Sequence, residues 1–486
     1  VLDINTNPNN PIIGNRSFGS SYNRVSKQAL AIMKGHHEAG ILTSGKHFPG
    51  HGDTSQDSHK TLPTVNFSSE RIKKIELAPF RKLISAGLSS VMVAHLDIPS
   101  ISKKGLPTSL SKKVIQNILK KELDFNGLVV TDAMNMKGVT EYSKVQNIDL
   151  TAFLAGHDII IISNNIPQGI KAIKNAYYKG IVTDKRLSYS VKKILKAKYK
   201  VGLNRYKSVS TKNLIQDLNT AEDDFLIYEA TGKSLTLLKN QNGILPLKKN
   251  KTYGHIILGD DFGISFKNQI SKYSSIKSVE GFSESNILNQ TSSLDTIIVS
   301  FHRSNKTPWM ASNFSKKEID IISILGKHKT LILDLFVKPY ALGGLEGING
   351  IDALVVSYQN SDISQKLSAD AIFGSQRFVG ELPVNVSQSF REGDGIEIKY
   401  INNLGIASPS DLGFDPKKLK KIDNLAQVAI DSMMTPGMRV LVLRKGKKVY
   451  DKNFGYHTFK KKRPVLENDI YDLASLTKIL GTLPLV

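Results

Sequence analysis

The chain has 486 residues, enough for about two to four domains, and its 40% hydrophobic and 22% charged residues are the composition of a globular protein. Lysine and arginine total 66 against 43 acidic residues, and the resulting net charge of +23 favours contact with anionic surfaces such as envelope polymers or nucleic acid. The absence of cysteine excludes disulfides, thiol catalysis and cysteine-ligated metal, and no apolar run approaches the roughly 18 residues of a membrane span.

Residues 1–203, the first unit, alternate short apolar runs with amphipathic stretches, which predicts a parallel sheet flanked by helices. The predicted strands are Val1–Ile4, Ile41–Ser44, Ser90–Ala94, Leu128–Thr131 and Asp158–Ile162. The predicted helices are Arg24–Glu38, Ser69–Ala86, Ser111–Leu123 and Lys185–Val201. Polar residues follow each strand, and barrel enzymes build their sites at such carboxyl ends. A doubly wound sheet would do the same, so the pattern alone favours a barrel only slightly.

Residues 204–400, the second unit, predict another α/β arrangement, an open sheet with helices on its faces. Its four buried-strand candidates are His255–Asp261, Thr296–His302, Thr330–Phe336 and Ala353–Asn360. The stretch Ser234–Lys248 predicts a hairpin that leads into this sheet.

Residues 401–486, the third unit, have a different pattern of predicted elements. Pro416–Ser432 predicts one amphipathic helix, and Met438–Gly455 predicts a β-hairpin with its turn near Lys445–Lys447. The chain opens on "VLDIN", inside a predicted strand, and closes on "GTLPLV", inside a predicted helix. We therefore expect a fragment at both ends.

The loop "GKHFPGHGDTSQDSHKTLP", Gly45–Pro63, gathers histidines, aspartates and lysines around glycines. Such groups suit a polyhydroxylated ligand, because hydroxyls need donors and acceptors at fixed angles and glycine allows close backbone approach. Within the loop, Asp57 and His59 are a candidate acid/base pair, since an aspartate beside a histidine fixes its tautomer and stabilises the imidazolium. A hydrogen-bonded surface loop is the alternative.

A second candidate is Asp132 in "GLVVTDAMNMKGV", Gly127–Val139. Four buried-strand residues deliver this carboxylate to the carboxyl end of a predicted strand, just before a helix start. Aspartate is also a common helix cap, and this purely structural role is the alternative.

Three stretches together resemble the β-N-acetylglucosaminidase branch of glycoside hydrolase family 3: "IIGNRSFG", "KHFPGHGDTSQDSH" and "VVTDAMNMKGV". "SLTLLKNQNGILPL" resembles the start of that family's second domain, so the resemblance covers residues 1 to about 400. It implies a (β/α)₈ TIM-type barrel followed by an α/β sandwich. The first strands of that barrel would precede Val1, so the barrel in this chain would be incomplete.

The resemblance also implies a retaining mechanism with a covalent glycosyl-enzyme intermediate. Asp132 would be the nucleophile, and His59, oriented by Asp57, would be the acid/base. Three further residues would bind the sugar: Arg16, Lys46 and His47.

The motif "SLTK" places Ser475 and Lys478 three residues apart, on one face of a predicted helix. S-x-x-K is the nucleophile motif of β-lactamases and penicillin-binding proteins, in which the lysine takes the serine proton. A helix, a hairpin and then "DLASLTK" resembles the opening of the class C β-lactamase-like serine hydrolases. Later motifs of that fold are absent, so we expect this portion to be inactive here. The alternative is an ordinary helix.

The sequence therefore predicts a glycosidase that removes terminal β-linked N-acetylglucosamine from peptidoglycan-derived or chitobiose-like sugars, fused to a serine hydrolase domain. Its partner would be a carbohydrate. No dinucleotide fingerprint, zinc spacing or nucleic-acid motif is visible, so we expect no cofactor, no metal and no nucleic-acid partner. The alternatives are a β-glucosidase or β-xylosidase and a non-catalytic glycan-binding protein. Export to the periplasm or cell envelope is expected, with the cytoplasm as the alternative.

Overall fold

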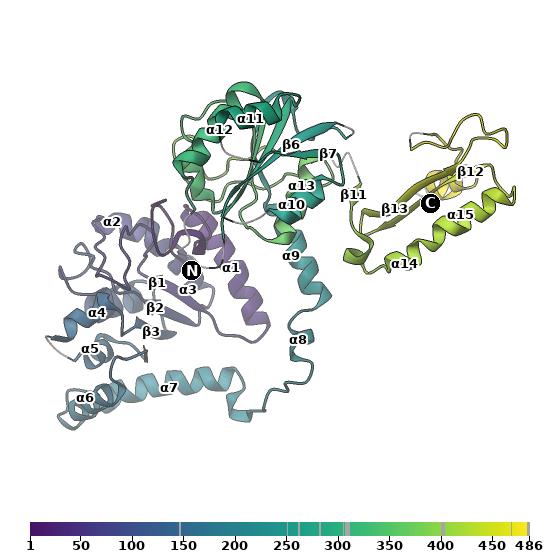
Figure 1. The fold of residues 1–486 in the computed structure, drawn as a ribbon. Coiled ribbons are helices and arrows are strands. Elements are labelled where there is room, and N and C mark those ends of the chain that lie inside the picture. The colour runs from purple at the N-terminus through teal and green to yellow at the C-terminus, as the bar shows by residue number, and fades with distance from the viewer. Residues whose placement is uncertain are drawn as a thin grey trace.

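The structure is a computed structural model that describes residues 1–144, 147–249, 251–260, 263–280, 283–304, 306, 312–399, 404–467 and 469–483. Its strands form three separate sheets, which Figure 1 shows in purple-blue, green and yellow-green along the chain. No helix among these residues is long and apolar enough to cross a membrane. Each sheet lies inside one of the three predicted units. The unit boundaries themselves stay predictions, and residues 400–403, where one of them falls, lie outside the described residues.

The first unit contains four parallel strands in the order β1-β2-β3-β4. They are β1 (Ser44–Phe48), β2 (Ser90–Val93), β3 (Leu128–Ala133) and β4 (Ile159–Ile161). The predicted parallel sheet with flanking helices is confirmed. Four described strands do not close an eight-stranded barrel, so the barrel stays a prediction.

Two of the five strand predictions in the first unit were wrong in detail. β1 begins at Ser44, where the predicted strand ends, so Lys46 and His47 lie within the strand and not in the loop after it. Val1–Ile4 is not a strand, although the N–H of Leu2 donates to the carbonyl of Lys46 at 2.6 Å and the segment runs beside β1.

Helices of the first unit cover the sheet around a core that includes Phe48, Phe80 and Val91. The first and last predicted helices appear as α1 (Tyr22–Glu38) and α7 (Asp184–Lys200). The second is divided into α2 (Ser69–Arg71) and α3 (Leu77–Ser85), which a wider helical turn at Ile72–Glu76 joins. The third appears as the helical segment Lys113–Glu122. The helix start expected after Asp132 appears as α4 (Lys137–Thr140), whereas α5 (Ile148–Ala155) and α6 (Ile166–Tyr178) were not predicted.

The second unit begins with α8 (Leu214–Asp217) and α9 (Ala221–Ser234), and its strands form a six-stranded sheet in the order β5-β10-β9-β8-β6-β7. Its strands are β5 (Thr236–Asn240), β6 (Thr252–Gly259), β7 (Ser275–Ser278), β8 (Thr296–His302), β9 (Thr330–Phe336) and β10 (Ile351–Val356). All four predicted strands are present, apart from Asp261, which lies outside the described residues. One apolar core lies on each side of the sheet, so the predicted open, two-sided sheet is confirmed.

Four helices flank this sheet: α10 (Ile264–Ile270), α11 (Glu284–Thr291), α12 (Lys316–His328) and α13 (Asp362–Ile372). The predicted hairpin at Ser234–Lys248 was wrong, because β5 pairs antiparallel with the distant β10. The side chain of Asn240 closes a turn by bonding the backbone of Leu245 at 2.9 and 3.1 Å, and Leu245 then enters the core instead of a second strand.

The third unit is a three-stranded sheet in the order β11-β13-β12. The hairpin of β12 (Gly437–Arg444) and β13 (Lys447–Gly455) is confirmed, and its turn residues Lys445 and Gly446 have φ of 50° and 72°, as tight hairpin turns require. β11 (Gly405–Ile406) was not predicted. The predicted helix is divided into α14 (Pro416–Leu419) and α15 (Lys421–Asp431).

Candidate active site

A buried carboxylate at the start of the chain, Asp3, organises the loop that follows β1. Its oxygens accept the backbone N–H of His51 at 2.7 Å, the backbone N–H of His47 at 3.1 and 3.2 Å, and Nδ1–H of the His47 ring at 2.7 Å. Burial would raise the pKa of Asp3, but His47 and the hydrogen bonds outweigh it and lower the pKa to about 2. The ionised Asp3 therefore fixes His47 as a donor through Nδ1.

The D-S-H stretch is anchored through its middle residue. Ser58 is buried, and its hydroxyl lies 3.0 Å from Nε2 of His51, whose Nδ1 lies 2.7 Å from the hydroxyl of Thr54. Burial lowers the pKa of His51, which keeps this ring neutral near pH 7. On either side of Ser58, Nδ1–H of His59 donates to Asp57 at 2.8 Å, and the His59 side chain is 54% exposed against 15% for Asp57.

Asp132 lies at the end of β3, half-buried, where its Oδ1 accepts the N–H of Ala133 at 2.8 Å. The helix-cap alternative is wrong, because α4 begins at Lys137 after Met136. Behind the strand end, Nε2–H of the buried His95 donates to the Ala133 carbonyl at 3.1 Å and Nδ1 accepts from Ser109 at 2.6 Å. Burial lowers the pKa of His95, in agreement with this singly protonated ring.

Backbone contacts hold the D-S-H loop against the segment that follows Asp132. The N–H of Gly138 donates to the Ser58 carbonyl at 3.3 Å, and the N–H of Lys137 donates to the His59 carbonyl at 3.4 Å. A side chain at Gly138 would place its Cβ 3.0 Å from the Ser58 oxygen and 2.9 Å from the Thr61 oxygen. Glycine at this position therefore allows the two loops to touch.

His95 links the two candidate residues electrostatically as well. Beyond the main effect of burial, Asp132 raises the pKa of His95 and His59 lowers it. Both groups thus lie within electrostatic reach of one ring. The loop that carries Asp57 and His59 thus contacts the segment that follows Asp132.

The other predicted sugar-binding residues lie beside the first strand. Lys46 is half-buried in β1, and Arg16 donates to the Ile12 carbonyl at 3.2 Å. The peptide bonds Lys46–His47 and Phe48–Pro49 are cis.

The second unit holds the segment that carries Arg16. Glu392 accepts the Ser21 hydroxyl at 2.6 Å, the Ser20 N–H at 3.2 Å and Nε–H of Arg24 at 3.1 Å, at the start of α1. Nδ2–H of Asn5 also donates to the Tyr340 hydroxyl at 2.6 Å. The conformation around Arg16 therefore depends on both units.

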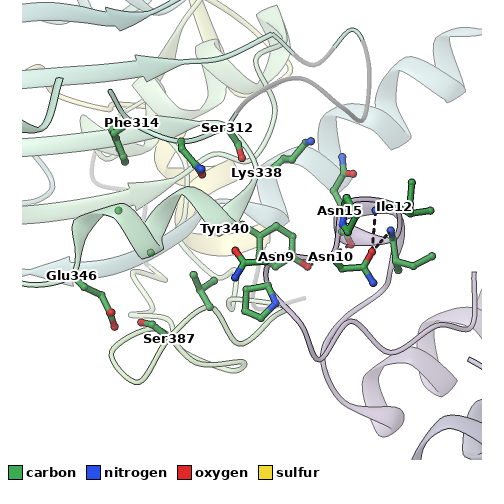
Figure 2. Close-up of a pocket in the computed structure, with 18 of the residues that line it drawn as sticks. Asn9, Asn10, Ile12, Asn15, Ser312, Phe314, Lys338, Tyr340, Glu346 and Ser387 are labelled. Atoms are coloured by element: carbon green, nitrogen blue, oxygen red, sulfur yellow. Dashed lines mark hydrogen bonds between the residues drawn. The ribbon is translucent and has the colours of Figure 1, made fainter. Parts of the chain in front are cut away.

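Figure 2 shows a pocket of about 710 Å³ between the two units. One wall is residues 8–15, stiffened by Asn10, whose Oδ1 accepts the N–H groups of Ile12 and Ile13 at 2.9 and 2.8 Å. The other wall comes from the second unit and includes Phe314, Lys338, Tyr340 and Glu346. None of the predicted catalytic residues lines this pocket. The wall formed by residues 8–15 ends next to Arg16.

Ser475 and Lys478 are adjacent in the third unit. Nζ of Lys478 donates to the Ser475 hydroxyl at 3.2 Å, and both side chains are exposed. Ser475 precedes the short helical segment and does not lie on a helix face as predicted.

Sequence reasoning missed Asp3, His51, His95 and Gly138. A signal existed for two of them, because "DIN" and "AHLD" are polar stretches that follow apolar runs. No signal identified His51 or Gly138, whose roles depend on contacts between distant segments. Within the described ranges, no three histidine, aspartate or glutamate side chains gather as metal ligands.

Comparison with known proteins finds two family resemblances. Residues 1–197 match the family described as "Glycosyl hydrolase family 3 N terminal domain". Residues 422–483 match a second family, described as "Beta-lactamase". Both resemblances seen in the sequence are thereby confirmed.

Relatives of the family 3 portion carry related names. Beta-hexosaminidase A of Pseudoalteromonas piscicida is 32% identical over 280 residues, 54% of this chain and 46% of that protein. A Cellulomonas fimi protein named beta-N-acetylglucosaminidase/beta-glucosidase is 27% identical over 269 residues, 54% of this chain and 48% of that protein. The chain thus spans about half the length of the curated relatives it matches. A solved family 3 beta-N-acetylglucosaminidase from Paenibacillus sp. str. FPU-7 is 26% identical, with a TM-score of 0.63 over 79% of this chain and 75% of that one.

Replacing Gly138 by alanine should destabilise the first unit. The new methyl group would meet two carbonyl oxygens of the D-S-H loop, and overpacking of this kind costs about 1–3 kcal/mol. Thermal unfolding of Gly138→Ala measures the loss. Gly35→Ala in α1 is the matched control, because nothing lies within 4 Å of its Cβ and alanine favours a helix. Equal melting temperatures for wild type and Gly138→Ala would contradict the contact.

The Asp3 network should stabilise the fold in a pH-dependent way. The pKa of Asp3 falls from 3.8 to about 2 on folding, so its stabilisation, on the order of 2 kcal/mol, is complete above about pH 5 and is lost as the pH falls toward 2. The destabilisation by Asp3→Asn should therefore shrink between pH 5 and pH 2, as measured by chemical unfolding. The exposed Asp295→Asn is the control, and a pH-independent difference for Asp3→Asn would contradict the prediction.

Proposed function

We propose that this chain carries the site of a retaining glycosidase that removes terminal β-linked N-acetylglucosamine from peptidoglycan-derived or chitobiose-like sugars. The supporting observation is the 2.8 Å hydrogen bond between His59 and Asp57 on a loop that rests against the residues following Asp132. It supplies an oriented proton carrier beside an available carboxylate. A TIM-type barrel and the unit boundaries at 203/204 and 400/401 belong to this proposal.

In the first step, a carboxylate oxygen of Asp132 attacks the anomeric carbon. The bond from that carbon to the leaving-group oxygen breaks, and this oxygen takes the proton from Nε2 of His59. Asp57 accepts Nδ1–H and balances the charge of the imidazolium before the proton leaves. The product of this step is a glycosyl ester on Asp132 and a neutral His59.

In the second step, His59 takes a proton from water through Nε2. The water oxygen attacks the anomeric carbon, and the bond to Asp132 breaks, which releases the sugar and restores both groups. Histidine suits both steps, because its usual pKa of about 6.5 lets it serve as acid and base near neutral pH. The 54% exposed side chain of His59 leaves room for leaving group and water.

Sugar binding falls to Arg16, Lys46 and His47. Their donors suit hydroxyl and acetamido oxygens. Asp3 fixes the ring orientation of His47, and the second unit fixes the segment of Arg16. Contacts from other segments therefore position His47 and the segment of Arg16.

A second candidate substrate is a β-glucoside, because the name of the Cellulomonas fimi relative includes beta-glucosidase. A β-xyloside and transfer of the sugar to phosphate are further variants of the same chemistry, and a non-catalytic glycan-binding role is the alternative from another class. For any of these glycans, an exported protein at the cell envelope fits the net charge of +23, and a cytoplasmic one stays the alternative.

The third unit would contribute a serine hydrolase, with Ser475 as nucleophile and Lys478 as the base that takes its proton. The 3.2 Å contact between Nζ and Oγ supports this assignment. Among the described residues, both side chains are exposed, so no enclosed acylation pocket surrounds them.

The proposed glycosidase is tested on the full-length protein with nitrophenyl β-N-acetylglucosaminide and nitrophenyl β-glucoside, with and without phosphate. Asp132→Asn should lower kcat at least a thousandfold, because no covalent intermediate can form. In His59→Ala, kcat should fall about 10²–10⁴-fold on a natural disaccharide. The fall should be smaller on the nitrophenyl sugar, because its leaving group needs little help from an acid.

Lys60→Ala, next to His59 but exposed, is the control that should keep wild-type rates. Full activity of Asp132→Asn would refute the nucleophile. Preference for the glucoside would replace the proposed sugar, and sugar binding without turnover by the wild type would favour the non-catalytic alternative.

Fluorescent penicillin tests the third unit. Because Ser475 lies exposed without a surrounding pocket, we expect this 486-residue chain to acquire no more label than its Ser475→Ala variant. Labelling of wild type that both Ser475→Ala and Lys478→Ala abolish would show that the residues present already form a working site.

A further inference from the structure

A buried carboxylate in α13, Asp370, lies where the second and third units meet. Its side chain is 1% exposed. Oδ1 accepts Nε2–H of Gln269 at 2.5 Å and the hydroxyl of Tyr273 at 2.7 Å, both from the α10 side of the second unit. Oδ2 accepts Nζ–H of Lys447 at 2.5 Å, from β13 of the third unit.

Lys447 is enclosed at this place. Its side chain is 14% exposed, and Nζ also lies 5.4 Å from the centre of the Tyr228 ring in α9. Burial would lower the pKa of Lys447, but Asp370 and Tyr228 outweigh it and the pKa is raised. The ammonium group is therefore charged and faces one carboxylate.

The strand β11 continues the contact beside this ion pair. Gly405 and Ile406 pair in parallel with Lys447 and Lys448 of β13. The Ile406 carbonyl accepts Nε2–H of Gln269 at 2.9 Å, and its N–H donates to the Tyr273 hydroxyl at 3.3 Å. Gln269 and Tyr273 thus bind both Asp370 and the third unit.

We propose that Asp370, Gln269, Tyr273 and Tyr228 form a socket on the second unit whose occupant is Lys447 of this chain's own β-hairpin, and that this contact holds the second and third units in one orientation. Figure 1 shows β11 between the green second unit and the yellow-green hairpin of the third unit. The proposal concerns docking between units and does not depend on the glycosidase assignment.

The physical basis is the cost of leaving a buried charge alone. Removing one partner of a buried ion pair is strongly destabilising, whereas replacing both is often nearly neutral. Exposed pairs behave differently and contribute little. The chain offers such a pair in the same hairpin: Lys452 to Asp423 at 2.8 Å, with side chains 49% and 30% exposed.

The experiment uses the full chain with Lys447→Met, Asp370→Asn, the double variant and Lys447→Arg, and with Lys452→Met as the matched control. Small-angle X-ray scattering reports the radius of gyration, and calorimetry reports the melting temperature of the second unit. Lys447→Met should increase the radius of gyration and lower that melting temperature by roughly 5–10 °C. Lys447→Arg should recover part of both losses, and Lys452→Met should change neither.

The double variant separates socket pairing from general damage. If the pair acts as a unit, the decrease in melting temperature of the double variant should be clearly smaller than the sum of the decreases of the two single variants. Additive losses, or an unchanged radius of gyration in Lys447→Met, would overturn the proposal. If Asp370→Asn does not fold, scattering from Lys447→Met and Lys447→Arg still decides between docked and undocked units. Glycosidase assays are not part of this test, so its failure leaves the proposed activity untouched.

Discussion

The candidate active site depends on the ionised carboxylate of Asp3, which is buried and accepts hydrogen bonds from His47 and His51. It fixes the backbone at His47 and His51, two positions on either side of the turn after β1. His51 in turn holds Ser58, and Ser58 accepts the backbone of Gly138. Each contact fixes the next, so the carboxylate of Asp3 helps to determine where the loop of His59 meets the segment after Asp132.

The second unit completes this arrangement from outside. Glu392 binds the start of α1, and Tyr340 contacts Asn5, so the segment that carries Arg16 is held between two sheets. The pocket of Figure 2 lies at this junction of the two units.

Sequence reasoning succeeded where the signal is local. The apolar runs of β2 and β9 and the turn at Lys445 are set by neighbouring residues, and each was predicted. It failed where pairing is non-local: β5 has the pattern of a hairpin strand, but its partner is β10, more than a hundred residues away. The α5 helix is apolar on most sides, so its periodicity carries little signal. The residue types of Asp57, His59 and Asp132 indicated chemistry, but the contact between their loops depends on Gly138, which spacing alone cannot reveal.

Three aspartates of this chain differ in how many donors their oxygens contact. Asp3 and Asp370 are 0% and 1% exposed, and each is surrounded by donors that include a histidine or a lysine. The oxygens of Asp3 take part in four donor contacts and those of Asp370 in three, so these buried carboxylates position other groups. Asp132 is half-buried and accepts Ala133 N–H on Oδ1, next to an electrostatically coupled neutral histidine. A nucleophile needs this less saturated state, because an oxygen engaged by two donors must break hydrogen bonds before it can attack carbon. The degree of saturation, more than the residue type, separates the structural carboxylates of this chain from the one that we propose as the nucleophile.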